Sequence, residues 1–179
     1  MSSAASPQST ENWLIKAKHV LDVEIQGVEA VRNRRGDSFV QALELMARCT
    51  GRVVVCGLGK SGLVGRKIAA TLSSTGTPSF FLHPVEGAHG DLGMIRTEDV
   101  ILAISYSGET DELNNILPSL KSLAGGVIGL TGGVNSTMAG LCDLVIDVAV
   151  PAEACPLGVA PTSSTTATLA VGDALAVCL

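Results

Sequence analysis

Aromatic residues are scarce in this chain of 179 residues, where Phe, Trp and Tyr together make up only 3%. Charged residues are also few, at 16%, whereas hydrophobic residues reach 46%. A core with so few aromatic residues has to be packed from Ala, Val, Leu and Ile, which suits a buried parallel sheet covered by helices. At this length we expect one domain with a full hydrophobic core.

The sequence also lacks an excess of positive charge, since its net charge is −5 and its isoelectric point is about 5.1. Proteins that bind nucleic acids normally present a basic surface, often with aromatic side chains that stack on bases. Neither feature is present. We therefore expect no nucleic-acid partner.

Long apolar runs are missing as well, because none approaches the roughly 18 residues that a membrane-spanning helix needs. The N-terminal stretch "MSSAASPQSTEN" lacks the positively charged and then apolar layout of a secretory signal. The five cysteines form no C-x-x-C pair, and we expect them to be small buried hydrophobic residues in a reducing compartment. These absences predict a cytoplasmic protein with no membrane partner.

Residues 1–9 are polar, and we expect them to form a disordered tail ahead of a single domain over residues 10–179. From Thr10 onward, apolar residues recur at three- and four-residue steps and predict a long amphipathic helix. That helix either covers the sheet or packs on another subunit. A second helix is predicted at about residues 37–49.

Beyond residue 50, five short apolar runs alternate with helical segments, and the runs are "RVVVCG", "SFFLH", "DVILAIS", "GGVIGLTG" and "LVIDV". Helices are predicted over residues 61–74 and 110–123, the latter with a kink or break near Asn114–Leu117 caused by Pro118. A last helix is expected to be capped by hydroxyls from Ser163 to Thr166. This alternation predicts a three-layer αβα, doubly wound sheet of about five parallel strands, of the flavodoxin or Rossmann kind, whose ligands bind at the carboxyl ends of the strands.

The loop after the first of these strands, in "VVVCGLGKSGLVGRK", resembles two phosphate-binding motifs at once. A nucleotide-triphosphate loop would need a glycine where Val54 stands, so that interpretation fails. A dinucleotide fold would need an acid at the end of the second strand, but His83 stands there and Glu86 comes three residues later. A nicotinamide or flavin site is thus a weaker alternative, and the loop is expected to present Lys60 and Ser61 at a helix N-terminus.

The loop after the third strand, "SYSGETDEL", brings three hydroxyls and a glycine to the first turn of a helix. Backbone N–H groups and the helix dipole favour an anion there, and Ser105, Ser107 and Thr110 can donate to its oxygens. The segment contains no Lys or Arg, so it predicts a small dianion held by neutral donors, such as a phosphate monoester. The alternative is that the three are ordinary capping and turn residues.

The S-x-S-G-E-T loop, together with G-x-G-K-S after the first strand, resembles the sugar isomerase (SIS) domain family. Two further stretches, "TGTPSFFLHPVEGAHGDLGMI" and "EACPLGVAPTSSTTATLAVGDALA", are similar to its D-arabinose-5-phosphate isomerases, and the resemblance runs from about residue 11 to the end. It implies interconversion of D-ribulose 5-phosphate and D-arabinose 5-phosphate through an enediolate, in supply of the Kdo sugar of lipopolysaccharide. It also implies a phosphorylated pentose as partner, no redox cofactor and no required metal.

The resemblance assigns substrate-binding roles to five residues. Ser105, Ser107 and Thr110 would hold the phosphate, and Ser61 would assist near the sugar. His89, in "GAHGD", would touch the substrate, in one interpretation from a neighbouring subunit, and in the other it is an ordinary loop histidine. SIS domains generally build sites across subunits, so self-association to a dimer or tetramer is expected.

Three residues match the catalytic positions of the family. Lys60 would stabilise developing negative charge or help to open the sugar ring. Glu112 and Glu153 match the catalytic carboxylates, and either could shuttle the proton. An acid in a first helical turn, such as Glu112, also complements the helix dipole without any catalytic role.

The sequence departs from the family at two points. Tyr106 stands where the pattern usually has Asn, which is expected to alter one wall of the phosphate pocket. The chain stops at Leu179, whereas family members usually continue into a segment with another catalytic histidine and a pair of CBS modules. We therefore expect an isolated SIS domain with reduced or absent activity, and the alternative function is a regulatory module that binds a sugar phosphate.

Overall fold

The structure, a computed structural model, describes residues 7–34 and 36–179. Its first helix, α1 (Pro7–Asn33), begins three residues before the predicted start at Thr10. The remainder of the predicted tail, residues 1–6, lies outside the described residues.

All five predicted strands are present and form one parallel sheet, made of β1 (Val53–Gly57), β2 (Ser79–Leu82), β3 (Val100–Ile104), β4 (Gly126–Thr131) and β5 (Leu144–Asp147). The strand order is β2-β1-β3-β4-β5, which is the flavodoxin-like arrangement of doubly wound folds. The predicted fold class is confirmed. In the register of the sheet Gly57 pairs with Ile104, so the loops after β1 and β3 leave the same edge side by side.

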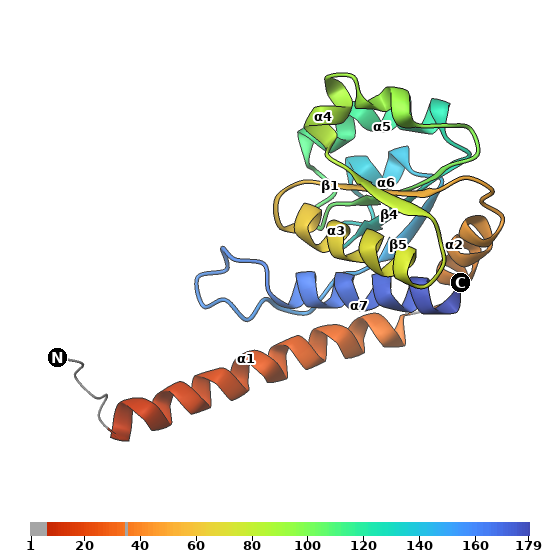
Figure 1. Ribbon diagram of the computed structural model, residues 1–179. Helices are drawn as coiled ribbons and strands as arrows, with labels where there is room; N and C mark the ends of the chain where they lie inside the picture. The colour runs from red at the N-terminus through yellow and green to blue at the C-terminus, as the bar shows by residue number, and fades with distance from the viewer. Residues whose placement is uncertain (1–6, 35) are drawn as a thin grey trace.

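Helices cover both faces of this sheet (Figure 1). One face carries α4 (Pro84–Ala88), α5 (Asp111–Leu123) and α6 (Thr137–Leu141), and the other carries α2 (Asp37–Ala47), α3 (Gly59–Ser74) and α7 (Ser163–Cys178). A 3₁₀ helix, η1 (Asp91–Met94), follows α4. The short elements α4, η1 and α6 were not predicted, because four- or five-residue helices have too few turns to show a period.

Alternation along the strands divides the core into two apolar clusters. Val53 and Val55 of β1 join the cluster that contacts α3 and α7, whereas Val54 and Cys56 join the one that contacts α5. Every residue of β1, β3 and β4 is buried, as expected for the central strands of a parallel sheet. The aliphatic composition therefore packs as predicted, with one cluster on each face.

Helix α1 packs on α7 rather than on the sheet, and its N-terminal half extends beyond the other elements (Figure 1). Gly27 permits the close crossing of the two helices, because an added Cβ would lie 3.2 Å from the Cβ of Ser163. Nearer the N-terminus the large apolar side chains of α1 are more than half exposed, namely Trp13, Leu14, Ile15, Leu21 and Ile25. Association with another subunit through this surface remains a prediction.

Two expectations are wrong in detail. Of the predicted kink or break at Pro118, the break does not occur, because helix α5 continues through the exposed proline with buried residues on both sides of it, namely Leu113, Ile116, Leu117 and Leu120. All five cysteines are free, but only Cys56 is buried and Cys178 is exposed. Across residues 7–34 and 36–179, no helix combines the length and the apolar character needed to span a membrane.

Candidate active site

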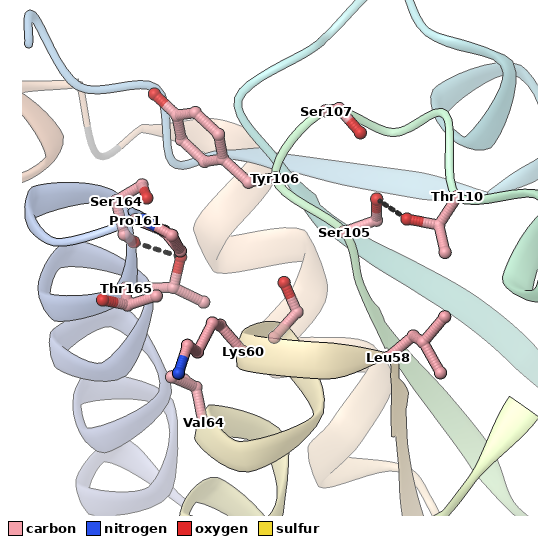
Figure 2. Close-up of a pocket in the computed structure, with 12 residues that line it drawn as sticks. Leu58, Lys60, Val64, Ser105, Tyr106, Ser107, Thr110, Pro161, Ser164 and Thr165 are labelled. Carbon is pink, nitrogen blue, oxygen red and sulfur yellow. Dashed lines mark hydrogen bonds between the residues drawn. The ribbon is translucent and has the colours of Figure 1, made fainter. Parts of the chain in front are cut away.

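A cavity of about 330 Å³ lies at the carboxyl edge of the sheet, where the loops after β1 and β3 meet the start of α7 (Figure 2). Its volume suits a small ligand. The lining combines hydroxyls with one cation and a few aliphatic side chains, from Leu58, Lys60, Ser61, Val64, Ser105, Tyr106, Ser107, Thr110, Pro161, Ser164, Thr165 and Thr168. Five of the eight predicted site residues are therefore brought together: Lys60, Ser61, Ser105, Ser107 and Thr110.

The loop after β3 is organised by its own hydroxyls. The Ser105 side chain is almost fully buried, and its Oγ lies 2.8 Å from Thr110 Oγ1 and accepts the N–H of Gly108 at 3.1 Å. Ser107 Oγ accepts the N–H of Glu109 at 3.2 Å. These contacts fold the loop around the N-terminus of α5, whose N-cap residue Thr110 makes no side-chain cap bond. The loop thus presents hydroxyls and the positive end of a helix dipole to the cavity.

Gly108 fixes the shape of this loop. Its φ of +72° lies in the left-handed region, and an added Cβ would lie 1.9 Å from the Oγ of Ser136. No other residue fits at this position without moving the loop after β4. The glycine of the S-x-S-G-E-T pattern is therefore required by backbone conformation and by space together.

The first turn of α3 forms a second wall of the cavity, between the loop after β3 and α7 (Figure 2). Gly59, at φ +58°, makes the left-handed turn that starts this helix and places Lys60 and Ser61 at the cavity. Gly62 packs directly on the preceding strand, since an added Cβ would lie 2.8 Å from the carbonyl oxygen of Gly57. In this loop the G-x-G-x-x-G spacing therefore serves the turn and the helix packing.

Glu153 caps α7 and is hydrogen-bonded to Ser164, which lines the cavity, but Glu153 is not itself among the lining residues. Its Oε2 accepts the N–H of Thr162 at 2.8 Å, the hydroxyl of Thr162 at 2.9 Å and the N–H of Ser164 at 3.3 Å. Burial raises the pKa of this carboxyl, but the nearby Ser164 hydroxyl and the hydrogen bonds from Thr162 and Ser164 lower it more, so the pKa lies below the ordinary 4.5. The carboxylate is therefore ionised at neutral pH. The predicted hydroxyl caps of α7 are replaced by a carboxylate nine residues upstream.

Three of the eight predicted residues do not line the cavity, namely Glu153, which is described above, Glu112 and His89. Glu112 is exposed in the first turn of α5, and His89 is exposed at the C-terminal end of α4. Neither is among the residues that surround the cavity in this chain. Their proposed roles in catalysis and substrate contact stay predictions.

Tyr106 lines the cavity, in agreement with its predicted place on one wall of the phosphate pocket, and the hydroxyl residues of α7 line it although they were not predicted to bind substrate. The Tyr106 hydroxyl accepts the N–H of Val150 at 3.0 Å, which connects the loop after β3 to the segment that leads to Glu153. In the sequence, the run from Ser163 to Thr166 indicated capping groups. This run contains more hydroxyls than one helix cap needs, and that excess could have indicated that some of them line a cavity.

A second hollow, of about 480 Å³, lies on the other side of Lys60, next to Arg66, Phe81 and His83. Its one guanidinium, that of Arg66, stacks 4.4 Å from the centre of the Phe81 ring. Hydroxyls and the N-terminal turns of α3, α5 and α7 meet at the smaller cavity, whereas of these three helix starts only that of α3 lines this hollow. The smaller cavity is therefore the better candidate for a phosphorylated ligand.

Comparison with known proteins identifies the family. Residues 46–178 match the model of the SIS domain. This chain belongs to the SIS domain family. The SIS domain seen here is 51% identical, over 168 residues, to the probable arabinose 5-phosphate isomerase of Haemophilus influenzae, and 55% identical, over 162 residues, to the arabinose 5-phosphate isomerase KdsD of Salmonella typhi.

These alignments cover 94% and 90% of this chain but only 50% and 49% of the relatives. The SIS domain chain thus spans about half the length of the curated relatives it matches. Among solved structures, Escherichia coli CFT073 c3406 in complex with A5P superposes with a TM-score of 0.90 at 42% identity, covering 97% of this chain and 91% of that one. The predicted resemblance to the family is confirmed.

Proposed function

We propose that this SIS domain catalyses the interconversion of D-ribulose 5-phosphate and D-arabinose 5-phosphate, the activity named for its relatives KdsD, in supply of the Kdo sugar. The observation that carries the proposal is that Ser105, Ser107 and Thr110 lie together on one wall of the cavity, at the N-terminus of α5. Lys60 lies on another wall of the same cavity. The similar E. coli chain is described in complex with A5P, which is the expected ligand class for such a wall.

The reaction needs a phosphate anchor, a base for the carbon-bound proton, and a group that stabilises the enediolate oxygen. We assign the anchor to the hydroxyls of the loop after β3 together with the amides of α5. Lys60, as the one cation among the described residues of the cavity wall, would stabilise the negative charge that develops on the oxygen, a type of contribution worth roughly 10²–10³-fold in rate.

Of the two candidate bases, Glu153 accepts the N–H of Ser164, a residue of the cavity wall, whereas Glu112 is exposed on α5. We therefore assign the base role to Glu153, whose Oε2 is engaged with α7 and whose Oε1 is the oxygen left to meet a proton. A lowered pKa keeps the carboxylate ionised, as a base must be, and also makes it a weaker proton acceptor. Glu112 would then act only if a second subunit brought it to the cavity.

The test is exchange of the proton on carbon 2 of arabinose 5-phosphate for deuterium, followed by NMR in D₂O. The wild-type chain is expected to exchange this proton and to form ribulose 5-phosphate. Glu153→Gln and Lys60→Ala are each expected to lower the rate by about 10²–10⁴-fold. Tight binding of the sugar phosphate without exchange, in this chain and in a longer chain that extends past Leu179, would instead favour the regulatory binding module.

We also propose that the chain self-associates, to a dimer or tetramer, through the exposed apolar surface of α1. Five large apolar side chains are more than half exposed within residues 13–25. Clusters of this kind on a soluble domain commonly mark interaction sites. Such an assembly offers one way for His89 or Glu112 of a neighbouring copy to approach a cavity.

A further inference from the structure

The wall of the cavity opposite the phosphate loop is the start of α7, where Ser164 and Thr165 lie in the first turn (Figure 2) and Thr168 lies in the second. The Thr168 hydroxyl donates to the carbonyl of Ser164 at 2.7 Å, and the Thr165 hydroxyl donates to the carbonyl of Thr162 at 2.7 Å. Both threonine hydroxyls therefore already donate hydrogen bonds to backbone carbonyls at the start of α7.

Ser164 is different from these neighbours. Its side chain is 1% exposed, and its Oγ makes no hydrogen bond to a described group, although it lies near enough to the Glu153 carboxylate to lower the pKa of that group. A buried hydroxyl without a partner costs about 1–3 kcal/mol and is uncommon in folded proteins. A position on the wall of a cavity gives this hydroxyl a possible use, because a ligand in the cavity can supply the missing partner.

The position of Ser164 in the cavity defines which part of a ligand it can meet. Ser105 and Thr110 lie on the far side, with Lys60 between them and α7 (Figure 2). A ligand whose phosphate is held by the loop after β3 would extend its carbon chain toward α7. The backbone N–H of Ser164 already donates to the Glu153 carboxylate, so this residue also stands next to the proposed base.

We infer that the Ser164 hydroxyl is a substrate-binding group, which hydrogen-bonds a hydroxyl or carbonyl oxygen of the sugar chain at the end away from the phosphate. This assignment rests on the proposed sugar-phosphate function and adds to it a recognition element for the carbon chain. A hydroxyl both donates and accepts, so Ser164 can serve either kind of sugar oxygen. Inorganic phosphate, which has no carbon chain, would not use it.

Ser163 provides a matched control on the same helix turn. It is also fully buried, and its Oγ also lacks a partner among the described groups. It packs against Gly27 of α1 and is not among the residues that line the cavity. Ser163→Ala and Ser164→Ala therefore remove the same atom from buried positions on one helix turn, but only Ser164 lines the cavity and stands beside the Glu153 carboxylate.

The experiment measures the affinity of the chain for arabinose 5-phosphate and for inorganic phosphate by calorimetry. Ser164→Ala is expected to weaken binding of the sugar phosphate by about 3–10-fold and to leave that of inorganic phosphate unchanged, because one neutral hydrogen bond is lost. Ser163→Ala is expected to change neither. Thermal melting of Ser163→Ala is expected to match or exceed that of wild type, since an unpaired buried hydroxyl is removed. Ser164→Ala is expected to melt no higher than Ser163→Ala, because the Ser164 hydroxyl also favours the ionised form of Glu153.

Equal sugar-phosphate affinities for Ser164→Ala and Ser163→Ala, in a chain whose wild type binds arabinose 5-phosphate more tightly than phosphate, would overturn this inference alone. A wild type that binds the two ligands equally would overturn it together with the proposed function. If Ser164→Ala fails to fold, Ser164→Cys serves in its place, since the thiol is a weak hydrogen-bonding group, and the same loss of affinity is expected.

Discussion

The Glu153 carboxylate accepts both the N–H and the hydroxyl of Thr162, at 2.8 and 2.9 Å, and so holds the start of α7 from nine residues upstream. The Thr162 hydroxyl in turn accepts the N–H of Ala154 at 2.8 Å. This closed set of hydrogen bonds fixes the segment that carries both the proposed base and the cavity wall of α7. The same carboxylate therefore serves stability and, in our proposal, catalysis.

Replacement of Glu153 by Gln is expected to lower the free energy of unfolding by about 1 kcal/mol at pH 7, because a helix cap loses its charge. The pKa of Glu153 is lower in the folded chain than the ordinary 4.5, so its ionised form stabilises the fold above about pH 4.5, and this contribution is lost as the pH falls through the folded-state pKa. Urea unfolding at several pH values measures the difference.

The control for this prediction is Glu112→Gln, which removes an exposed acid from the first turn of α5. It is expected to change stability by less than Glu153→Gln. A stability gap between wild type and Glu153→Gln that stays constant from pH 7 to pH 3 would contradict the assigned role of the charge.

Tyr106 is expected to position the segment before Glu153 rather than to bind the phosphate. In Tyr106→Phe the N–H of Val150 loses its acceptor, so the free energy of unfolding is expected to fall by about 1 kcal/mol. For isomerisation of arabinose 5-phosphate, kcat is expected to fall while KM changes less than about two-fold. A raised KM with an unchanged kcat would instead indicate that this side chain shapes the phosphate wall.

Gly108 is expected to tolerate no side chain. Gly108→Ala places a Cβ against Ser136 at a φ of +72°, so we predict a loss of stability of about 2 kcal/mol or more and loss of phosphate affinity. Gly140, in α6, has open space around its added Cβ and serves as the control. Gly140→Ala is expected to keep the affinity and to be neutral or slightly stabilising. Circular dichroism melts and phosphate titrations measure both variants.

The exposed surface of α1 is expected to hold copies of the chain together. Trp13→Glu places a charge where an apolar side chain is 59% exposed, and it is expected to shift the mass measured by light scattering toward the monomer. Gln26→Glu adds the same charge at an exposed polar position of the same helix and is expected to leave the mass unchanged. A monomeric wild type would contradict the proposed self-association.

The order of strands and helices along the chain was predicted well from the sequence, and so were the two loops of the site that follow β1 and β3. Both depend on local patterns of residues. The strand "RVVVCG" and the loop "SYSGET" carry their own apolar runs and hydroxyls, and parallel strands bring their carboxyl ends to one edge. Capping of α7 by Glu153 was beyond such reasoning, since it depends on how an irregular loop folds back over nine residues. The uninterrupted helix around Pro118 depends likewise on burial of its neighbours in the tertiary structure.

The side chains of α7 that complete the site could not be predicted, because they are far in the sequence from the loop that they face. Ser164 and Ser105 stand 59 residues apart and meet across a cavity because α7 packs beside α3 at the carboxyl edge of the sheet. A run of Ser and Thr at a helix start has an ordinary explanation in capping. Only the contacts of Thr165 and Thr168 with the backbone distinguish their hydroxyls from the unpartnered one of Ser164.

The central claim is that the hydroxyls of the loop after β3 hold the phosphate of a sugar phosphate whose other end faces Lys60 and α7. A crystal structure of the chain with arabinose 5-phosphate tests it most directly. We predict phosphate oxygens about 2.5–3.0 Å from the hydroxyl oxygens of Ser105, Ser107 or Thr110. A phosphate bound instead in the second hollow, beside Arg66 and His83, would contradict the account.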